Sequence, residues 1–226
     1  LGASQGFRAP NLSDLTRWDA DWGEEIPTPG LAPESFLSLE VGGRLRYELF
    51  RAEAAYFHTL IEDLIVRVPT GATNPVGSIP IVSKENSGEG YIHGVELSGS
   101  VALHRDWTLW SNFTWMEGRV EAPLVVGGPV QTEPVSRIMP MTVNAGLRWQ
   151  HSNGRWWAEL AATFAALQDQ LAPNDRLDTQ RIPPGGTPGY DVYHLRAGWR
   201  PCANASITVA MENLTDRDYR IHGSGV

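Results

Sequence analysis

Long segments in which apolar and polar residues alternate occupy much of this 226-residue chain. Within residues 190–200, for example, Leu195 and Trp199 fall on one face, and His194 and Arg196 fall on the other. Alternation with a period of two indicates a β-strand that has one apolar and one polar face. The chain is therefore expected to be an all-β protein.

The predicted strands are long, and their connections are alternately short and long. The strands are predicted over residues 36–47, 50–68, 89–103, 107–119, 139–149, 155–166, 190–200 and 204–212, with a β-bulge near Ile61–Asp63. Long loops are predicted over residues 8–34, 69–88, 120–137 and 167–189, and the other connections are short turns. This arrangement is typical of an antiparallel transmembrane β-barrel. We expect a partial barrel of about eight to ten strands, with short periplasmic turns and long extracellular loops.

Aromatic residues mark one end of the apolar face. Several of them share the parity of the apolar residues and lie within a few positions of a short turn. Amphipathic aromatic side chains are enriched where a protein surface meets lipid headgroups. Five residues are therefore predicted to form a membrane-interface girdle, namely Tyr47, Trp107, Trp149, Trp156 and Trp199. Trp115 and Phe164 have the same parity at the opposite strand ends and are candidates for a second girdle.

The opposite face carries charged residues, among them Arg44, Glu53, Arg148, Glu159 and Arg196. In a membrane barrel these side chains line the aqueous lumen, whereas in a soluble fold they form the outer surface. A soluble antiparallel β-sandwich with its apolar faces inside is therefore the alternative. The strand lengths and the asymmetry of the loops favour the membrane barrel.

The composition argues against several kinds of site. The net charge of −8 argues against a nucleic-acid partner, because phosphate binding needs a basic surface. A single cysteine, Cys202, excludes an intrachain disulfide and a cysteine-cluster metal site. No apolar run approaches the roughly 18 residues that a membrane helix needs.

The first long loop carries the residues best suited to ligand recognition. Two tryptophans among several charged side chains suit a sugar, a cation or a metal chelate. The candidate ligand-binding residues are Arg17, Trp18, Asp19, Asp21 and Trp22, and Glu24 and Glu25 extend the acidic cluster. The alternative is a solvated acidic loop, since charge runs usually face water. The same alternative applies to Asp175, Arg176 and Asp178 in the last long loop.

No catalytic site, metal site or cofactor is predicted, so we do not expect an enzyme. The six histidines are dispersed, and none forms a close-spaced pair of metal ligands. The adjacent carboxylates Glu62 and Asp63 lack a companion nucleophile, as do Glu24 and Glu25. The glycine-rich stretch Gly88–Gly94 enters a strand rather than a helix, so it is not a phosphate loop. Its glycines are expected to allow strand bending or close packing.

Four stretches of the chain resemble segments of TonB-dependent outer-membrane receptors. Gly6–Leu15 (GFRAPNLSDL) is similar to the Arg-Ala/Ser-Pro segment of that family, and Ala54–Val68 to its strand with an aromatic pair. Asn86–Leu103 resembles its Asn-x-Gly-x-Gly-x-x-x-Gly-Val-Glu segment, and Met211–Gly225 resembles its near-terminal Glu-Asn-Leu-Thr-Asp segment. The four stretches occur in the family's order and extend over nearly the whole chain.

The resemblance implies that residues 1–226 are the C-terminal portion of a barrel of about 22 strands, truncated at both ends. The plug domain, the energy-coupling box and the last strand of the family are expected to lie outside this sequence. The implied function is TonB-coupled uptake of a scarce bulky solute, such as a ferric siderophore, haem, cobalamin or glycan. The implied partners are that small-molecule or metal-chelate ligand, the TonB complex through the plug, and lipid of a Gram-negative-type outer membrane. A passive porin-like channel and a soluble carbohydrate-binding β-sandwich are the alternatives.

Overall fold

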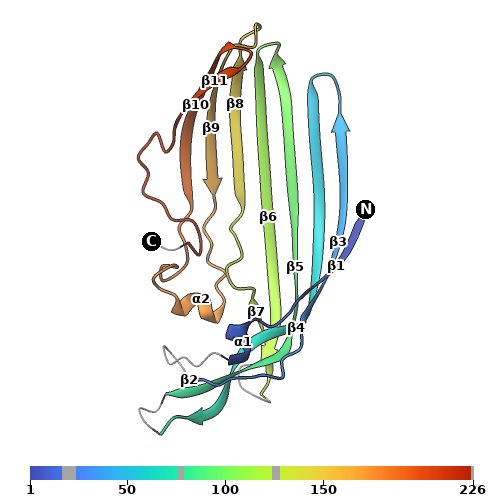
Figure 1. The fold of residues 1–226 in the computed structure, drawn as a ribbon, viewed down its shortest axis with the longest axis vertical. Helices are drawn as coiled ribbons and strands as arrows, with labels where there is room; N and C mark the ends of the chain where they lie inside the picture. The colour runs from blue at the N-terminus through green and yellow to red at the C-terminus, as the bar shows by residue number, and fades with distance from the viewer. Residues whose placement is uncertain (17–23, 76–78, 124–127, 225–226) are drawn as a thin grey trace. The chain divides into compact units, whose positions relative to one another are not determined.

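The computed structural model describes residues 1–16, 24–75, 79–123 and 128–224 of a chain that is almost entirely β (Figure 1). The strands follow the order β1-β3-β4-β5-β6-β8-β9-β10-β11, while β2 pairs with β5 and β7 pairs with β6. Their bounds are β1 Gly2–Arg8, β2 Glu24–Glu25, β3 Glu34–Arg46, β4 Phe50–Thr73, β5 Pro80–His104, β6 Trp107–Pro123, β7 Val130–Pro134, β8 Thr142–Gln150, β9 Trp156–Ala165, β10 Tyr190–Cys202 and β11 Ala205–Met211. The two short helices are α1 Leu12–Thr16 and α2 Pro173–Leu177. In the described part of the chain, neither helix is long and apolar enough to cross a membrane.

The chain divides into two compact units, which are described separately. Unit 1 comprises residues 1–40, 57–93 and 117–135. In this unit β1 pairs antiparallel with β3, so that Arg8 lies opposite Glu34. The short strand β2 is the exception to the antiparallel rule, because it runs parallel to β5 with Glu25 opposite Val82.

Unit 2 comprises residues 41–56, 94–116 and 136–226. Antiparallel ladders join β6 to β8, β8 to β9, β9 to β10 and β10 to β11. Two indole rings lie flat over glycines on neighbouring strands: Trp110 over Gly146 and Trp157 over Gly198. A Cβ atom at Gly198 would lie 2.1 Å from Nε1 of Trp157, so only glycine leaves room for the ring.

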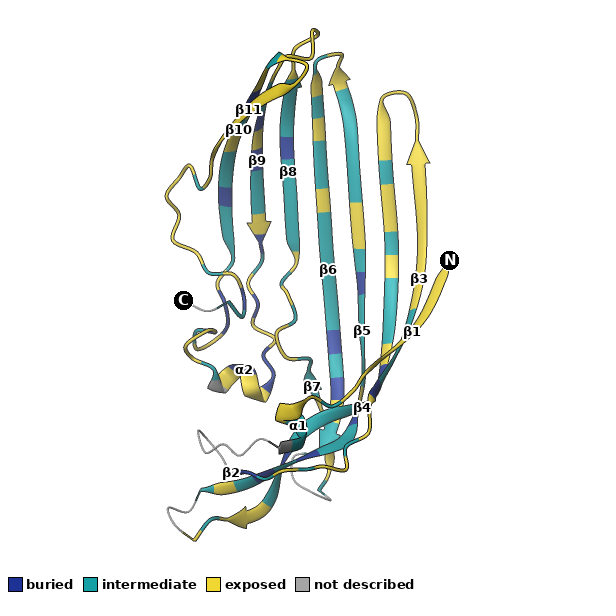
Figure 2. Ribbon diagram, in the orientation of Figure 1, coloured by how far each residue is buried: buried dark blue, intermediate teal, exposed yellow. Residues whose placement is uncertain are grey.

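Many large apolar side chains of unit 2 are exposed, and exposed segments (yellow) recur along its strands in Figure 2. Leu109, Leu160, Leu195 and Val209 are all exposed, and they carry the apolar parity that the sequence predicts. Glu159, which lies on the polar face of β9, is buried. This distribution suits a strand face that meets lipid and an opposite face that is lined by polar groups.

Two predicted loops contain strand instead. The predicted loop over residues 69–88 is wrong at both ends, because β4 continues to Thr73 and β5 begins at Pro80. The predicted loop over residues 120–137 likewise contains the end of β6 and all of β7, which pair with Pro123 opposite Val130. Ladder hydrogen bonds come from the backbone of the partner strand, so residues with turn-like composition remain extended where a partner lies opposite.

The irregularity predicted near Ile61–Asp63 coincides with an unusual backbone conformation. Asp63 lies within β4 and has a φ of +56°, which is uncommon for a residue other than glycine. Its carbonyl accepts a hydrogen bond from Nδ2 of Asn86 at 2.8 Å. A polar side chain from the adjacent strand thereby satisfies a carbonyl at the point where β4 departs from regular geometry.

Candidate functional site

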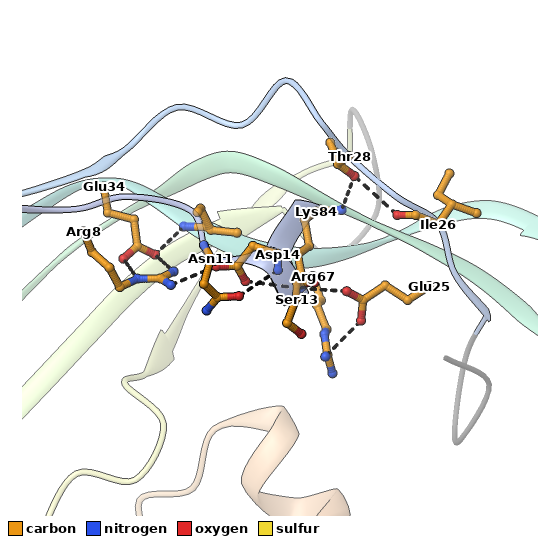
Figure 3. A network of polar contacts seen from close by, with 11 residues as sticks. Arg8, Asn11, Ser13, Asp14, Glu25, Ile26, Thr28, Glu34, Arg67 and Lys84 are labelled. Carbon is orange, nitrogen blue, oxygen red and sulfur yellow. Dashed lines mark hydrogen bonds and ion pairs between the residues drawn. The ribbon is translucent and has the colours of Figure 1, made fainter. Parts of the chain in front are cut away.

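The predicted ligand-binding residues Arg17, Trp18, Asp19, Asp21 and Trp22 lie outside the described residues. The segments that flank them, α1 and β2, are described, and both belong to unit 1. Charged side chains from α1 and β2 meet side chains of β1, β3, β4 and β5 in a continuous polar network (Figure 3). This network is the candidate functional site.

Helix α1 begins with a reciprocal cap that fixes Asp14. The backbone N–H of Asp14 donates to Oδ1 of Asn11 at 2.9 Å, and the N–H of Asn11 donates to Oδ2 of Asp14 at 3.0 Å. This is a capping box in which aspartate takes the place of the usual glutamate. It satisfies two backbone donors that the first turn leaves free, and it directs the remaining carboxylate oxygen, Oδ1, toward Lys84.

Six charged residues alternate in sign along the network. Arg8 forms a bidentate pair with Glu34, in which Nη2 and Oε1 are 2.7 Å apart, and its Nη1 lies 2.9 Å from Oδ2 of Asp14. Lys84 pairs with Glu25, and Glu25 in turn pairs with Nη2 of Arg67 at 2.9 Å. Three cations thus match three carboxylates, and each of the six has an oppositely charged neighbour.

Lys84 joins the two segments that flank the predicted binding loop. Its Nζ donates to the carbonyl of Ser13 at 3.1 Å and lies 3.2 Å from Oδ1 of Asp14, both on α1. The same atom lies 2.7 Å from Oε1 of Glu25 on β2. The side chains of Lys84 and Glu25 are only 7% and 5% exposed. One buried ammonium group therefore binds both ends of the segment that carries Arg17–Trp22, and we call this arrangement the loop anchor.

Glu34 fixes the other side of the network. Besides binding Arg8, its Oε1 accepts a hydrogen bond from the backbone N–H of Ile65 on β4 at 2.9 Å. The carboxylate is almost completely buried, and these charge-assisted hydrogen bonds compensate for its loss of water. The hydrogen bond to Glu34 also raises the pKa of Arg8 above its ordinary value, so the guanidinium stays charged.

The environment of Asp14 favours its ionised form. Burial alone would raise the pKa of this carboxyl. The hydrogen bonds from the Asn11 N–H, Arg8 and Lys84 outweigh burial, so the pKa of Asp14 lies below its ordinary value. Asp14 is therefore a carboxylate at neutral pH, which the pairing with Lys84 requires.

Acidification is expected to loosen the loop anchor at Asp14. Because the pKa of Asp14 is lower in the folded than in the unfolded chain, its stabilising contribution is complete above the unfolded value of about 3.9 and is lost as the pH falls through the lower folded value. Amide hydrogen-exchange protection in α1 should fall over that range. Asp14→Asn should reduce protection already at neutral pH and remove the pH dependence, and an unchanged dependence would contradict this role.

Sequence reasoning identified Glu25 as part of an acidic cluster but missed Lys84 and Arg67. The sequence did contain one signal, because Lys84 is the only lysine among 18 lysines and arginines. A lysine ammonium is a compact charge with three donors, which suits three acceptors arranged around one atom. The partners, however, lie 59 to 71 residues away along the chain, and no local pattern connects them.

The last long loop contains a second buried carboxylate. The solvated-loop alternative does not hold for Asp175, which is 2% exposed. This carboxylate accepts hydrogen bonds from Oγ of Ser136 at 2.6 Å and from the backbone N–H groups of Arg137 and Ala172. Asp178 is more exposed and pairs with Arg137 and Arg181. The cluster orders the loop around α2.

The five predicted girdle residues all belong to unit 2, and the strand registers bring four of them together in pairs. Trp107 lies opposite Trp149, and Trp199 lies opposite Trp156 with parallel rings 5.1 Å apart. Tyr47, Trp107, Trp156 and Trp199 are exposed. The girdle itself remains a prediction about the protein in a bilayer.

Comparison with known proteins relates the chain to one family. The family model described as TonB dependent receptor-like, beta-barrel, matches residues 1–214. The chain also resembles the solved structure of the copper transporter OprC, with a TM-score of 0.75 and 19% identity over 99% of this chain and 32% of OprC. A search of curated protein sequences found no match.

Two receptors from Pseudomonas aeruginosa are similar in fold as well. The siderophore receptor PirA has a TM-score of 0.63 and 20% identity over 96% of this chain and 36% of PirA. The ferric enterobactin receptor PfeA has a TM-score of 0.68 and 19% identity over 99% of this chain and 34% of PfeA. At these identities the structures show the fold alone, and the chain spans about a third of each of them.

Proposed function

Because the chain belongs to the TonB-dependent receptor-like β-barrel family, we propose that it forms part of the wall of an outer-membrane receptor that takes up a scarce bulky solute by TonB-coupled transport. The family match over residues 1–214 is the observation that carries this proposal. The same match, together with the apolar exposed face of unit 2, argues against the soluble β-sandwich alternative. Similar structures include a protein named as a copper transporter, one named as a siderophore receptor and one named as a ferric enterobactin receptor.

The proposed cargo is a metal chelate or another bulky solute, such as a ferric siderophore, haem, cobalamin or glycan. In this proposal the segment Arg17–Trp22 contacts the cargo through its indole rings and charged side chains. The loop anchor supports this role, because a recognition loop binds more tightly when its ends are held and less ordering entropy is lost on binding. The barrel wall lies in a Gram-negative-type outer membrane, and the TonB complex acts through a plug domain.

Uptake measurements in cells test the proposal. The test uses a panel of four radiolabelled solutes, namely a ferric siderophore, haem, cobalamin and a glycan. Cells that express the intact gene should accumulate at least one of them from nanomolar external concentration. Accumulation should be abolished when TonB is deleted or the proton gradient is collapsed. A passive porin-like channel predicts uptake that is independent of TonB and does not saturate. TonB-independent uptake of every solute in the panel would overturn the proposal.

The orientation of the strand faces can be tested with a matched pair of arginine substitutions. Leu160 on β9 is 51% exposed and lies four residues from Trp156, so it should lie near the middle of the bilayer. Leu160→Arg is expected to destabilise the membrane-inserted protein by about 2–4 kcal/mol. Asn112→Arg, at a similar depth on the polar face, should be close to neutral. The measurement is reversible unfolding in lipid vesicles, and equal effects would contradict the assignment of faces.

A further inference from the structure

The part of the chain that follows β11 returns to the loop between β9 and β10. Residues 213–224 have no regular secondary structure, and in Figure 1 they run from β11 back toward α2. Nη1 of Arg220 donates to the carbonyl of Gln180 at 3.2 Å, and the ring centroids of Tyr219 and Tyr190 are 4.5 Å apart. This segment is therefore attached to the β9–β10 loop and to the start of β10, and we call it the strap.

His222 is the most deeply buried residue of the strap. It is 5% exposed, and its Nδ1 lies 2.9 Å from Oγ1 of Thr187, which is 3% exposed. Thr187 is itself fixed, because its N–H and its carbonyl form hydrogen bonds of 3.0 Å with the backbone of Gln168 near the start of the loop. The contact between His222 and Thr187 thus joins the strap to an ordered part of the β9–β10 loop.

The other ring nitrogen of His222 has no partner. Its Nε2 is buried and finds no hydrogen-bond partner among the described residues. A neutral imidazole has one donor and one acceptor nitrogen, so Nδ1 can share a single hydrogen with the Thr187 hydroxyl. An imidazolium has two N–H donors, and the donor at Nε2 would be buried without an acceptor. The site therefore suits the neutral form of the ring.

The surroundings of His222 do not favour its protonation. Burial has the largest effect and lowers the pKa of His222 below its ordinary value, against the attraction of Asp175 on α2. Arg137, which precedes β8, acts in the same direction as burial. The carboxylate of Asp175 already accepts hydrogen bonds from Ser136 and from two backbone N–H groups, and the Arg137 guanidinium pairs with Asp178. Further titratable groups at the strap are Tyr190 and His194 on β10, and Tyr219 and Arg220 on the strap itself.

We propose that His222 is a pH-sensitive latch, which holds the strap on the β9–β10 loop while the imidazole is neutral and releases it when acid protonates the ring. Because closure of the strap lowers the pKa of His222, the stabilising contribution of the latch is complete above the ordinary value of about 6.5. It is lost as the pH falls through the lower value of the closed state. The strap then no longer contacts Gln180 and Thr187, so this part of the loop becomes more mobile. The latch acts independently of the solute that is transported.

Hydrogen exchange of the full-length protein in detergent micelles tests the latch, with rates corrected for the direct effect of pH on amide exchange. In the wild type, peptides that cover residues 180–189 and 214–224 should be protected at about pH 7.5 and lose protection as the pH is lowered to about 5. The protection factor should fall about tenfold for each unit by which closure of the strap lowers the pKa of His222. This range lies above the value of about 3.9 that applies to Asp14, so the two acid effects are separable.

Two variants remove the titrating group. His222→Gln keeps a polar side chain and His222→Phe fills the buried site with an apolar ring, so in at least one of them the strap should stay protected at both pH values. His194→Gln is the matched control, because Nδ1 of His194 lies 3.4 Å from the backbone nitrogen of Asn213 at the start of the strap. In this control, residues 219–224 should keep the acid dependence of the wild type.

Three results would overturn the latch. The first is wild-type protection of the strap that does not fall on acidification. The second is the same acid-dependent loss of protection in both His222 variants. The third is an unprotected strap at about pH 7.5 in both variants, since a neutral side chain at this position would then not suffice for closure.

Discussion

Replacing Lys84 with methionine is expected to release the loop anchor and lower its stability by about 3–5 kcal/mol, the effect typical of removing one partner from a buried ion pair. Methionine has a similar volume, so packing is largely preserved while the charge is lost. Asp14 and Glu25 would then face each other without the ammonium group that lies 3.2 Å and 2.7 Å from their carboxylate oxygens. Both α1 and β2 should separate from β5 as a result.

Limited proteolysis measures this release. Trypsin cleavage after Arg17, which lies between the two anchored segments, should be much faster in Lys84→Met than in the wild type. Arg105→Met removes an exposed cation from a turn of unit 2 and should leave cleavage at Arg17 unchanged. Under the proposed function, Lys84→Met should also weaken solute capture by the full-length protein while leaving its barrel assembled. Equal cleavage of variant and wild type would contradict the anchor.

Gly90→Ala is expected to destabilise unit 1 by about 1–3 kcal/mol, the usual effect of overpacking a well-packed site. Gly90 lies on β5, and a Cβ atom there would lie 2.2 Å from the carbonyl oxygen of Arg119 and 3.0 Å from the Cα of Val120. Both are backbone atoms of β6, so relief requires the two strands to move apart and lengthens their hydrogen bonds. Because the atoms in contact belong to the backbone, no side-chain rotation can relieve the clash.

Gly43→Ala provides the comparison. Gly43 also lies within a long strand, β3, but a Cβ atom added there meets no other atom within 4 Å. Its replacement should be neutral or slightly stabilising, because alanine restricts the unfolded chain more than glycine does. Urea unfolding of the two variants in lipid vesicles gives the difference directly. Similar midpoints for Gly90→Ala and Gly43→Ala would show that β5 and β6 tolerate the added methyl group.

The glycine-rich stretch Gly88–Gly94 shows what sequence reasoning could predict about packing and what it could not. The absence of a following helix was enough to reject a phosphate loop and to expect close packing. The structure confirms the close packing at Gly88 and Gly90, where an added Cβ would approach Val66 at 2.9 Å and Arg119 at 2.2 Å. Which strand approaches each glycine depends on register, and alternation alone carries no information on register.

The predicted ends of the strands β4 and β5 are also wrong. Alternation fades after Val68 and resumes near Glu89, so the intervening residues were predicted as a loop. The hairpin instead extends to a turn closed by the N–H of Asn74 and the carbonyl of Ile79, 2.8 Å apart. Both strands continue because each provides the hydrogen-bond partner for the other, and this pairing does not require an apolar face.

By itself, the sequence determined the β-class of the fold, the apolar and polar faces of each strand, and the five aromatics at the turn ends. These properties are local, since side chains along a strand alternate with a period of two whatever the strand pairs with. Only the tertiary structure decided the loop anchor. Lys84 reaches Asp14 and Glu25 across 70 and 59 residues of the chain. Such groups meet only when the sheet has assembled, because strand order and register set their distances.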